Sequence, residues 1–77
     1  MRPYSVYAWH PLTEGWEGRN AALARLAGRR PETNCAGGGV YELSWSCETV
    51  SEAEDLRDIL RAVPGVTSTC DWYAAFR

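Results

Sequence analysis

The sequence predicts an α+β fold in which three strands and two helices alternate along a single domain, residues 1–77. Three observations carry this prediction. Three stretches are rich in the β-branched and aromatic residues that favour strands, or alternate apolar with polar residues. Two stretches place apolar residues at helical spacing. The segments between them hold Gly, Pro, Asn and Ser, which are typical of turns. The expected order is therefore β-α-β-α-β.

The first strand is expected over residues 4–10, because Tyr, Val and Trp favour strands and a proline stands on either side. The second, residues 40–47, alternates strictly, and the last covers residues 66–76. Neither face of the first strand is clearly polar, so its orientation stays open. Its two faces hold Tyr4, Val6, Ala8 and His10, or Ser5, Tyr7 and Trp9. In the other strands the expected helix-facing residues are Tyr41, Leu43, Trp45, Cys47, Val66, Cys70, Trp72, Ala74 and Phe76.

The first helix is expected to begin after Thr13 as its cap and to stop at Gly28. The residues follow helical spacing from about Trp16 or Arg19 to Ala27. The expected apolar face consists of Trp16, Leu23, Leu26 and Ala27.

The second helix is expected to begin at a capping box, with Ser51 as N-cap and Glu54 at the third helical position. It should end at Pro64 and Gly65, which cannot continue a helix. Its expected apolar stripe is Ala53, Leu56, Ile59, Leu60 and Val63.

Two sheet topologies fit this order. One is a parallel sheet of two βαβ units. The other is a mainly antiparallel, three-stranded, reduced ferredoxin-like sheet, with both helices on one face and the first strand between the other two. The second is favoured, because parallel sheets need cover on both faces and their strands are continuously apolar. The segment 29–39 is expected to be a loop that gives the chain room to reverse or to form a short extra edge strand.

The number of cysteines and the length of the apolar runs indicate the cellular compartment in which the protein is expected. The three Cys are an odd number and form no CxxC, unlike the disulfide framework of a small secreted domain. No charged region followed by an apolar one opens the chain, so a signal peptide is not expected. The apolar runs are far shorter than the roughly 20 residues that span a membrane. A cytoplasmic protein without membrane association is expected.

No catalytic, metal or cofactor site is expected. The Cys and His residues are spaced too irregularly for zinc. A nucleophilic thiol needs a base within hydrogen-bond reach, and nothing in the sequence brings Cys35 to His10. The glycines at 37–39 follow a helix, whereas a phosphate-binding loop precedes one. The residues that could ligate a metal are His10, Cys35, Cys47 and Cys70.

Charge is divided unevenly along the chain. The net charge is −2, and all eight basic residues are Arg. Such a chain lacks the basic tract that phosphate backbones need, so direct binding of nucleic acid is disfavoured. Acidic residues gather around the second helix, where Glu48, Glu52 and Asp55 share one side. These three are candidates for contacting a basic partner protein.

Aromatic residues supply the second candidate surface. If Val6 and Ala8 point inward, Tyr7 and Trp9 lie on the uncovered face of the sheet, together with Tyr73. Exposed rings of this kind mark interaction sites and are enriched in binding hot spots. The predicted binding residues are therefore Tyr7, Trp9, Tyr73, Glu48, Glu52 and Asp55.

These features favour a small non-enzymatic protein-binding module or inhibitor, whose partner is another protein such as a nucleic-acid-handling complex. In size and style the chain is similar to the small proteins that phages and mobile elements encode against a host machine, anti-CRISPR proteins among them. That likeness covers no motif. One alternative is a nucleic-acid-binding domain that uses Arg19, Arg25, Arg29 and Arg30 beside the aromatic face. Another is a small thiol-dependent enzyme. A homodimer is a further alternative, because exposed sheet edges can pair between subunits.

Overall fold

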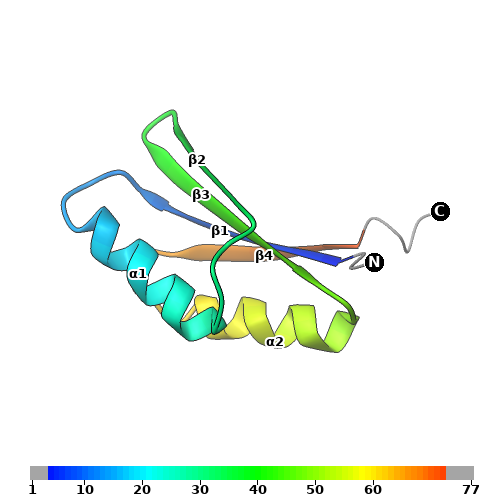
Figure 1. The fold of residues 1–77 in the computed structure, drawn as a ribbon. Coiled ribbons are helices and arrows are strands. Elements are labelled where there is room, and N and C mark those ends of the chain that lie inside the picture. Colours follow the sequence, from blue (N-terminus) through cyan, green and yellow to red (C-terminus); the bar gives the residue numbers. More distant parts are fainter. Residues whose placement is uncertain (1–3, 73–77) are drawn as a thin grey trace.

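The computed structural model describes residues 4–72, and they form a four-stranded antiparallel sheet with two helices on one face (Figure 1). The α+β class is thereby confirmed. In chain order the elements are β1 Tyr4–Pro11, α1 Trp16–Ala27, β2 Thr33–Gly37, β3 Val40–Cys47, α2 Val50–Leu60 and β4 Thr67–Trp72. The end of the last expected strand, residues 73–76, lies outside the described residues.

The strand order is β2-β3-β1-β4, so β1 has β3 on one side and β4 on the other. All pairings are antiparallel. The prediction of three strands is wrong, and the description as a reduced, three-stranded ferredoxin-like sheet is not confirmed. The fourth strand is β2, which pairs with the outer side of β3.

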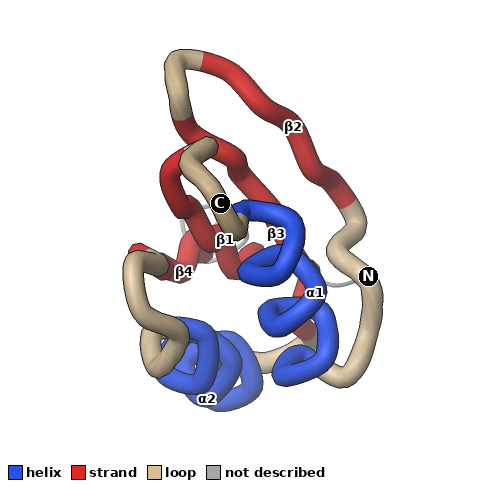
Figure 2. Tube along the Cα trace, turned by 90° about the vertical axis from the view of Figure 1, so that its left-hand side faces the viewer, coloured by secondary structure: helices blue, strands red, loops and turns tan. Residues whose placement is uncertain are grey.

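Residues 29–39 are not loop throughout: five of them form β2, the short extra edge strand for which this segment was expected to give room. A two-residue turn at Gly38 and Gly39 joins β2 to β3, and both glycines have positive φ (60° and 78°). Such backbone angles are those of the tight turns that connect antiparallel strands, and Gly adopts them without steric cost. The three consecutive glycines therefore close a hairpin. In Figure 2 this hairpin extends well away from α2.

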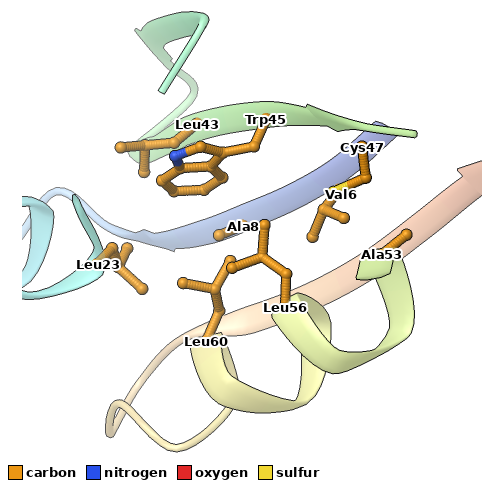
Figure 3. Packing of buried hydrophobic residues seen from close by; sticks show 9 residues of the cluster. All are labelled: Val6, Ala8, Leu23, Leu43, Trp45, Cys47, Ala53, Leu56 and Leu60. Atoms are coloured by element: carbon orange, nitrogen blue, oxygen red, sulfur yellow. The ribbon is translucent and has the colours of Figure 1, made fainter. Parts of the chain in front are cut away.

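The core lies between the sheet and the two helices (Figure 3). Val6 and Ala8 of β1 and Leu43 and Trp45 of β3 point towards the helices and are buried. They meet Leu23 of α1 and the apolar stripe of α2. The remaining buried members of this core are Cys47, Ala53, Leu56 and Leu60. No helix within residues 4–72 is long and apolar enough to cross a membrane.

The helix starts differ from those predicted. The N-cap of α1 is Gly15 in the left-handed conformation, with no side-chain cap, so Thr13 is not the capping residue. Helix α2 begins two residues early: the Thr49 hydroxyl accepts a hydrogen bond from the Glu52 backbone N–H at 3.1 Å. Ser51 is therefore already helical. Two hydroxyl residues close together, Thr49 and Ser51, make such a start ambiguous from sequence.

Candidate functional site

The orientation of β1 decides where the aromatic residues lie. Because Val6, Ala8 and His10 face the helices and are buried, Tyr7 and Trp9 lie on the opposite face of the sheet, which neither α1 nor α2 covers. Their rings stack in nearly parallel planes, with centroids 5.8 Å apart. Both side chains are partly exposed. The third predicted member of this surface, Tyr73, lies outside the described residues.

The register places polar neighbours beside these two rings. Glu42 of β3 stands opposite Trp9, and its carboxylate accepts a hydrogen bond of 2.6 Å from the indole Nε1. Ser44 stands opposite Tyr7 on the same side. On the other side of β1, Thr67 and Thr69 are paired with Trp9 and Tyr7. We call the face of the sheet that lies opposite the helices, around Tyr7, Trp9, Glu42 and Ser44, the open sheet face.

A hollow of about 370 Å³ lies at the hairpin end of the open sheet face. The Cys35 thiol lies at 3.9 Å from the second carboxylate oxygen of Glu42, so indole, carboxylate and thiol form one small cluster. Residues of both hairpin strands complete the hollow. It is lined by Trp9, Cys35, Ala36, Gly37, Val40 and Glu42.

The hypothesis that Cys35 works with His10 fails on geometry. His10 faces the helices and is only 1% exposed, whereas Cys35 belongs to the opposite side of the sheet, beside Glu42. The imidazole is held in place: Arg19 Nε donates to its Nδ1 at 3.3 Å, and its Nε2 lies 2.5 Å from Asn20 Oδ1. Since a base must reach the thiol it activates, His10 cannot serve Cys35.

The arginines proposed for nucleic-acid contact do not lie on the open sheet face, since no strand within residues 4–72 contains Arg or Lys. Arg19 instead holds the loop between β1 and α1. Its guanidinium donates to the carbonyl oxygens of Pro11 at 2.8 Å and Thr13 at 3.3 Å. Arg25 and Arg30 are exposed on and after α1.

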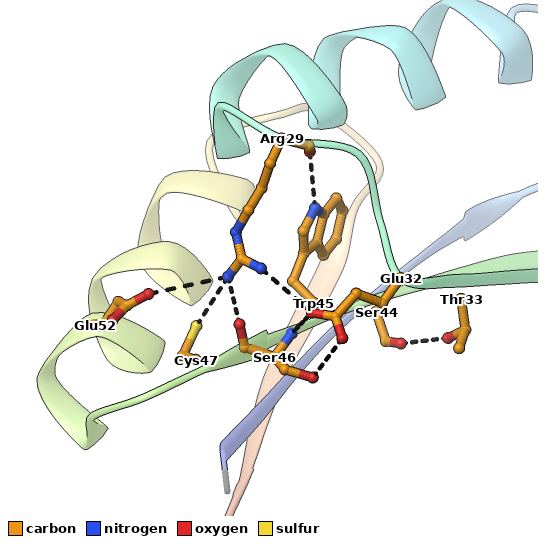
Figure 4. A network of polar contacts seen from close by, with 8 residues as sticks. All are labelled: Arg29, Glu32, Thr33, Ser44, Trp45, Ser46, Cys47 and Glu52. Carbon is orange, nitrogen blue, oxygen red and sulfur yellow. Dashed lines mark hydrogen bonds and ion pairs between the residues drawn. The ribbon is translucent and has the colours of Figure 1, made fainter. Parts of the chain in front are cut away.

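Arg29 is the centre of a polar network that joins α1, β3 and α2 (Figure 4). Its guanidinium donates to the Ser46 carbonyl oxygen, and lies 3.3 Å from the Glu32 carboxylate and 4.0 Å from that of Glu52. The Arg29 carbonyl oxygen accepts a 3.0 Å hydrogen bond from the Trp45 indole. Glu32 in turn accepts from the Ser46 backbone N–H at 2.7 Å. Nothing in the sequence indicated this network.

The acidic side of α2 borders a groove of about 230 Å³ between the two helices. Glu52 and Asp55 line it, beside the apolar side chains of Leu26 and Ile59. These two were predicted to face the core, but they are 47% and 44% exposed, so that prediction is wrong. Glu48, the third predicted acidic residue, precedes the helix and does not line the groove. We call this site the helix groove.

Cys47 is buried in the core, and Cys70 is partly buried and packs against it. Burial raises the pKa of Cys47 and of Cys70 above the ordinary 9.0, and the charge of Glu52 adds to the effect at Cys47. The folded chain therefore holds these protons more tightly than the unfolded chain does. Their contribution to stability is complete below pH 9.0 and is lost as the pH rises through the folded-state pKa values.

We expect the free energy of unfolding, measured by urea denaturation, to fall as the pH rises above 9.0, the ordinary thiol pKa. Cys70→Ala should flatten this decline, because it removes one of the shifted thiols. Cys35→Ser is the matched control, since Cys35 is exposed and should leave the slope unchanged. An equal slope in all three proteins would contradict the assignment.

No protein-family model matches this chain, and no match to it was found among the curated proteins or the solved structures.

Proposed function

We propose that this chain is a protein-binding module that docks through the open sheet face. The observation that carries the proposal is the stacked pair of Tyr7 and Trp9 in the middle of a sheet whose helices cover only the other side. Partly exposed Tyr and Trp combine large apolar area with a hydrogen-bonding group, which is why these residues are enriched in binding hot spots.

The polar groups around the rings suit a protein partner. The exposed Thr67 and Thr69 can pair with backbone and side-chain groups of another chain, and Glu42 supplies one negative charge. A partner of complementary charge is favoured, because electrostatic complementarity raises association rates and suppresses wrong partners. A basic surface such as that of a nucleic-acid-handling complex has this character. Docking there makes the module an inhibitor of that complex, without an enzymatic activity of its own.

The charge distribution argues against nucleic acid as the ligand of this face. Bases could stack on Tyr7 and Trp9, but the phosphates that accompany them need cations. The strands that form the face carry no Arg or Lys within the described chain. We expect no mobility shift of single-stranded DNA or RNA by the protein, even at low salt. A shift that weakens steeply with added salt would support the nucleic-acid alternative instead.

Replacing both rings tests the proposal. Tyr7→Ala with Trp9→Ala should lower affinity for the partner about 100-fold or more, because hot-spot rings carry most of an interface's energy. The partner is first captured from the native host with the wild-type protein, and binding is then measured by calorimetry. Arg25→Ala with Arg30→Ala is the control, since both are exposed away from the sheet. Unchanged affinity in a folded double-ring variant would refute docking through this face.

The helix groove is a second candidate surface, favoured by the exposed Leu26 and Ile59 beside two carboxylates. Its apolar floor and acidic rim fit a basic amphipathic segment of a protein. Asp55→Arg should then lower affinity about tenfold by reversing charge at the rim. Glu54→Arg is a closely matched control, because Glu54 is the neighbouring exposed acid and does not line the groove. Equal effects of both variants would show only a general charge effect.

The thiol-enzyme alternative rests on Cys35, whose expected base lies on the other face of the sheet. Any thiol-dependent activity should disappear when the exposed Cys35 thiol is alkylated. An activity that survives alkylation would rule out this hypothesis.

A further inference from the structure

The outer edge of β2 is open to a further strand. Within the described residues β2 pairs with β3 alone, and all five of its residues are exposed. Edge strands are normally protected by charged residues, proline or a bulge. Between Thr33 and Gly37 there is no charged residue and no proline, and each residue pairs one to one with β3. This edge therefore lacks the usual protection against strand pairing.

The hairpin defines which backbone groups face outward. A two-residue turn at Gly38 and Gly39 closes on the pair Gly37 and Val40, which is hydrogen-bonded in such hairpins. Bonded and non-bonded pairs then alternate along an antiparallel ladder. Cys35 is thus bonded to β3, whereas the N–H and C=O groups of Asn34 and Ala36 point to the free edge.

We propose that a second copy of this chain pairs with β2 along this edge, antiparallel, with the two Cys35 residues facing each other at a two-fold axis. This register overlaps the two copies over all five residues. It also brings the outward groups of Asn34 against those of Ala36 in the partner copy, and the reverse. Four backbone hydrogen bonds then form between the copies, two on either side of the axis.

The side chains of β2 suit pairing with themselves. In this register Thr33 meets Gly37 and Asn34 meets Ala36, so each larger residue stands opposite a smaller one. No like charges are brought face to face, because β2 carries none. A two-fold axis perpendicular to the sheet keeps the same face of both copies on one side. The dimer therefore continues the sheet across both copies and sets two open sheet faces side by side, independently of what they bind.

Sedimentation velocity of the full chain over a range of concentrations tests the pairing. The wild-type protein should form a weak, concentration-dependent dimer. Ala36→Pro should raise its dissociation constant about tenfold or more, because it removes two of the four bonds between copies. The fold should survive, since that N–H makes no bond to β3 and edge strands tolerate proline. Cys35→Ser, which leaves the backbone unchanged, should dimerise like the wild type.

Cross-linking tests the register without relying on the proline variant. A non-bonded antiparallel pair has Cα atoms about 4.5 Å apart, within the range that a disulfide spans. Glutathione disulfide as oxidant should therefore link the wild-type chains through Cys35, with glutathione reduced as the disulfide forms. Thr33→Cys in the Cys35→Ser background should not cross-link, because position 33 faces position 37 of the other copy. The proposal would be overturned if no dimer formed at protein concentrations up to about 1 mM. Cross-linking at position 33 equal to that at position 35 would also overturn it.

Discussion

Trp45→Ala is expected to abolish the cooperative unfolding transition of this domain. The Trp45 side chain is fully buried between β1, α1 and α2, and its indole N–H is satisfied by the Arg29 carbonyl oxygen. Truncating a buried Trp costs about 3–5 kcal/mol, from lost transfer free energy and from the cavity left behind. A domain of this size has roughly 3–5 kcal/mol of stability in all. The variant is therefore expected to retain almost no free energy of unfolding.

Urea denaturation followed by circular dichroism measures this effect. Trp9→Ala is the matched control, because it removes the same side chain from the open sheet face, where it is partly exposed. Its free energy of unfolding should fall by only about 1 kcal/mol, because it loses the stacking on Tyr7 and the hydrogen bond to Glu42. A Trp45→Ala protein that unfolds at the same urea concentration as Trp9→Ala would contradict the core described here.

Arg29→Ala is expected to lower the free energy of unfolding by about 2 kcal/mol, because hydrogen bonds from a charged donor are lost at several acceptors at once. The guanidinium bonds the Ser46 carbonyl and lies near the carboxylates of Glu32 and Glu52. Its removal leaves both carboxylates without this cation. The link between the end of α1, the start of β2 and the end of β3 should loosen as well.

Arg30→Ala is the neighbouring control. Arg30 is exposed, so its loss should change the free energy of unfolding by no more than about 0.5 kcal/mol. Hydrogen exchange should show faster opening of the β2–β3 pairing in Arg29→Ala and not in Arg30→Ala. Equal stability of the two variants would mean that the Arg29 contacts contribute nothing measurable.

The sequence predicted the strands best where one face is apolar and the other polar. Residues 40–47 alternate strictly, and β3 has these bounds and this facing. Strand β2 was anticipated only as one possible outcome of the 29–39 segment, because Thr33–Gly37 contains Asn and Gly, which strands disfavour, and no large apolar residue. Its formation depends on the turn at Gly38 and Gly39 and on pairing with β3. Such tertiary pairing overrides a weak local propensity.

The candidate surfaces were only partly visible in the sequence. Both faces of β1 carry apolar residues, so periodicity could not decide whether Val6 or Tyr7 points inward. The sequence could not predict the helix groove, because Leu26 and Ile59 have the same spacing as core residues. They are exposed because the two helices cover one face of a small sheet and leave part of each helix uncovered. The acidic neighbours Glu52 and Asp55 were recognised, since charge is readable residue by residue.

The most direct test of docking through the open sheet face is position-specific cross-linking. A photoreactive benzoylphenylalanine at position 7 is compared with the same residue at position 25, which is exposed on α1. In an extract of the native host, we expect a light-dependent covalent adduct with one protein partner from position 7 and none from position 25. Adducts from position 25 alone, in a folded pair of variants, would contradict it.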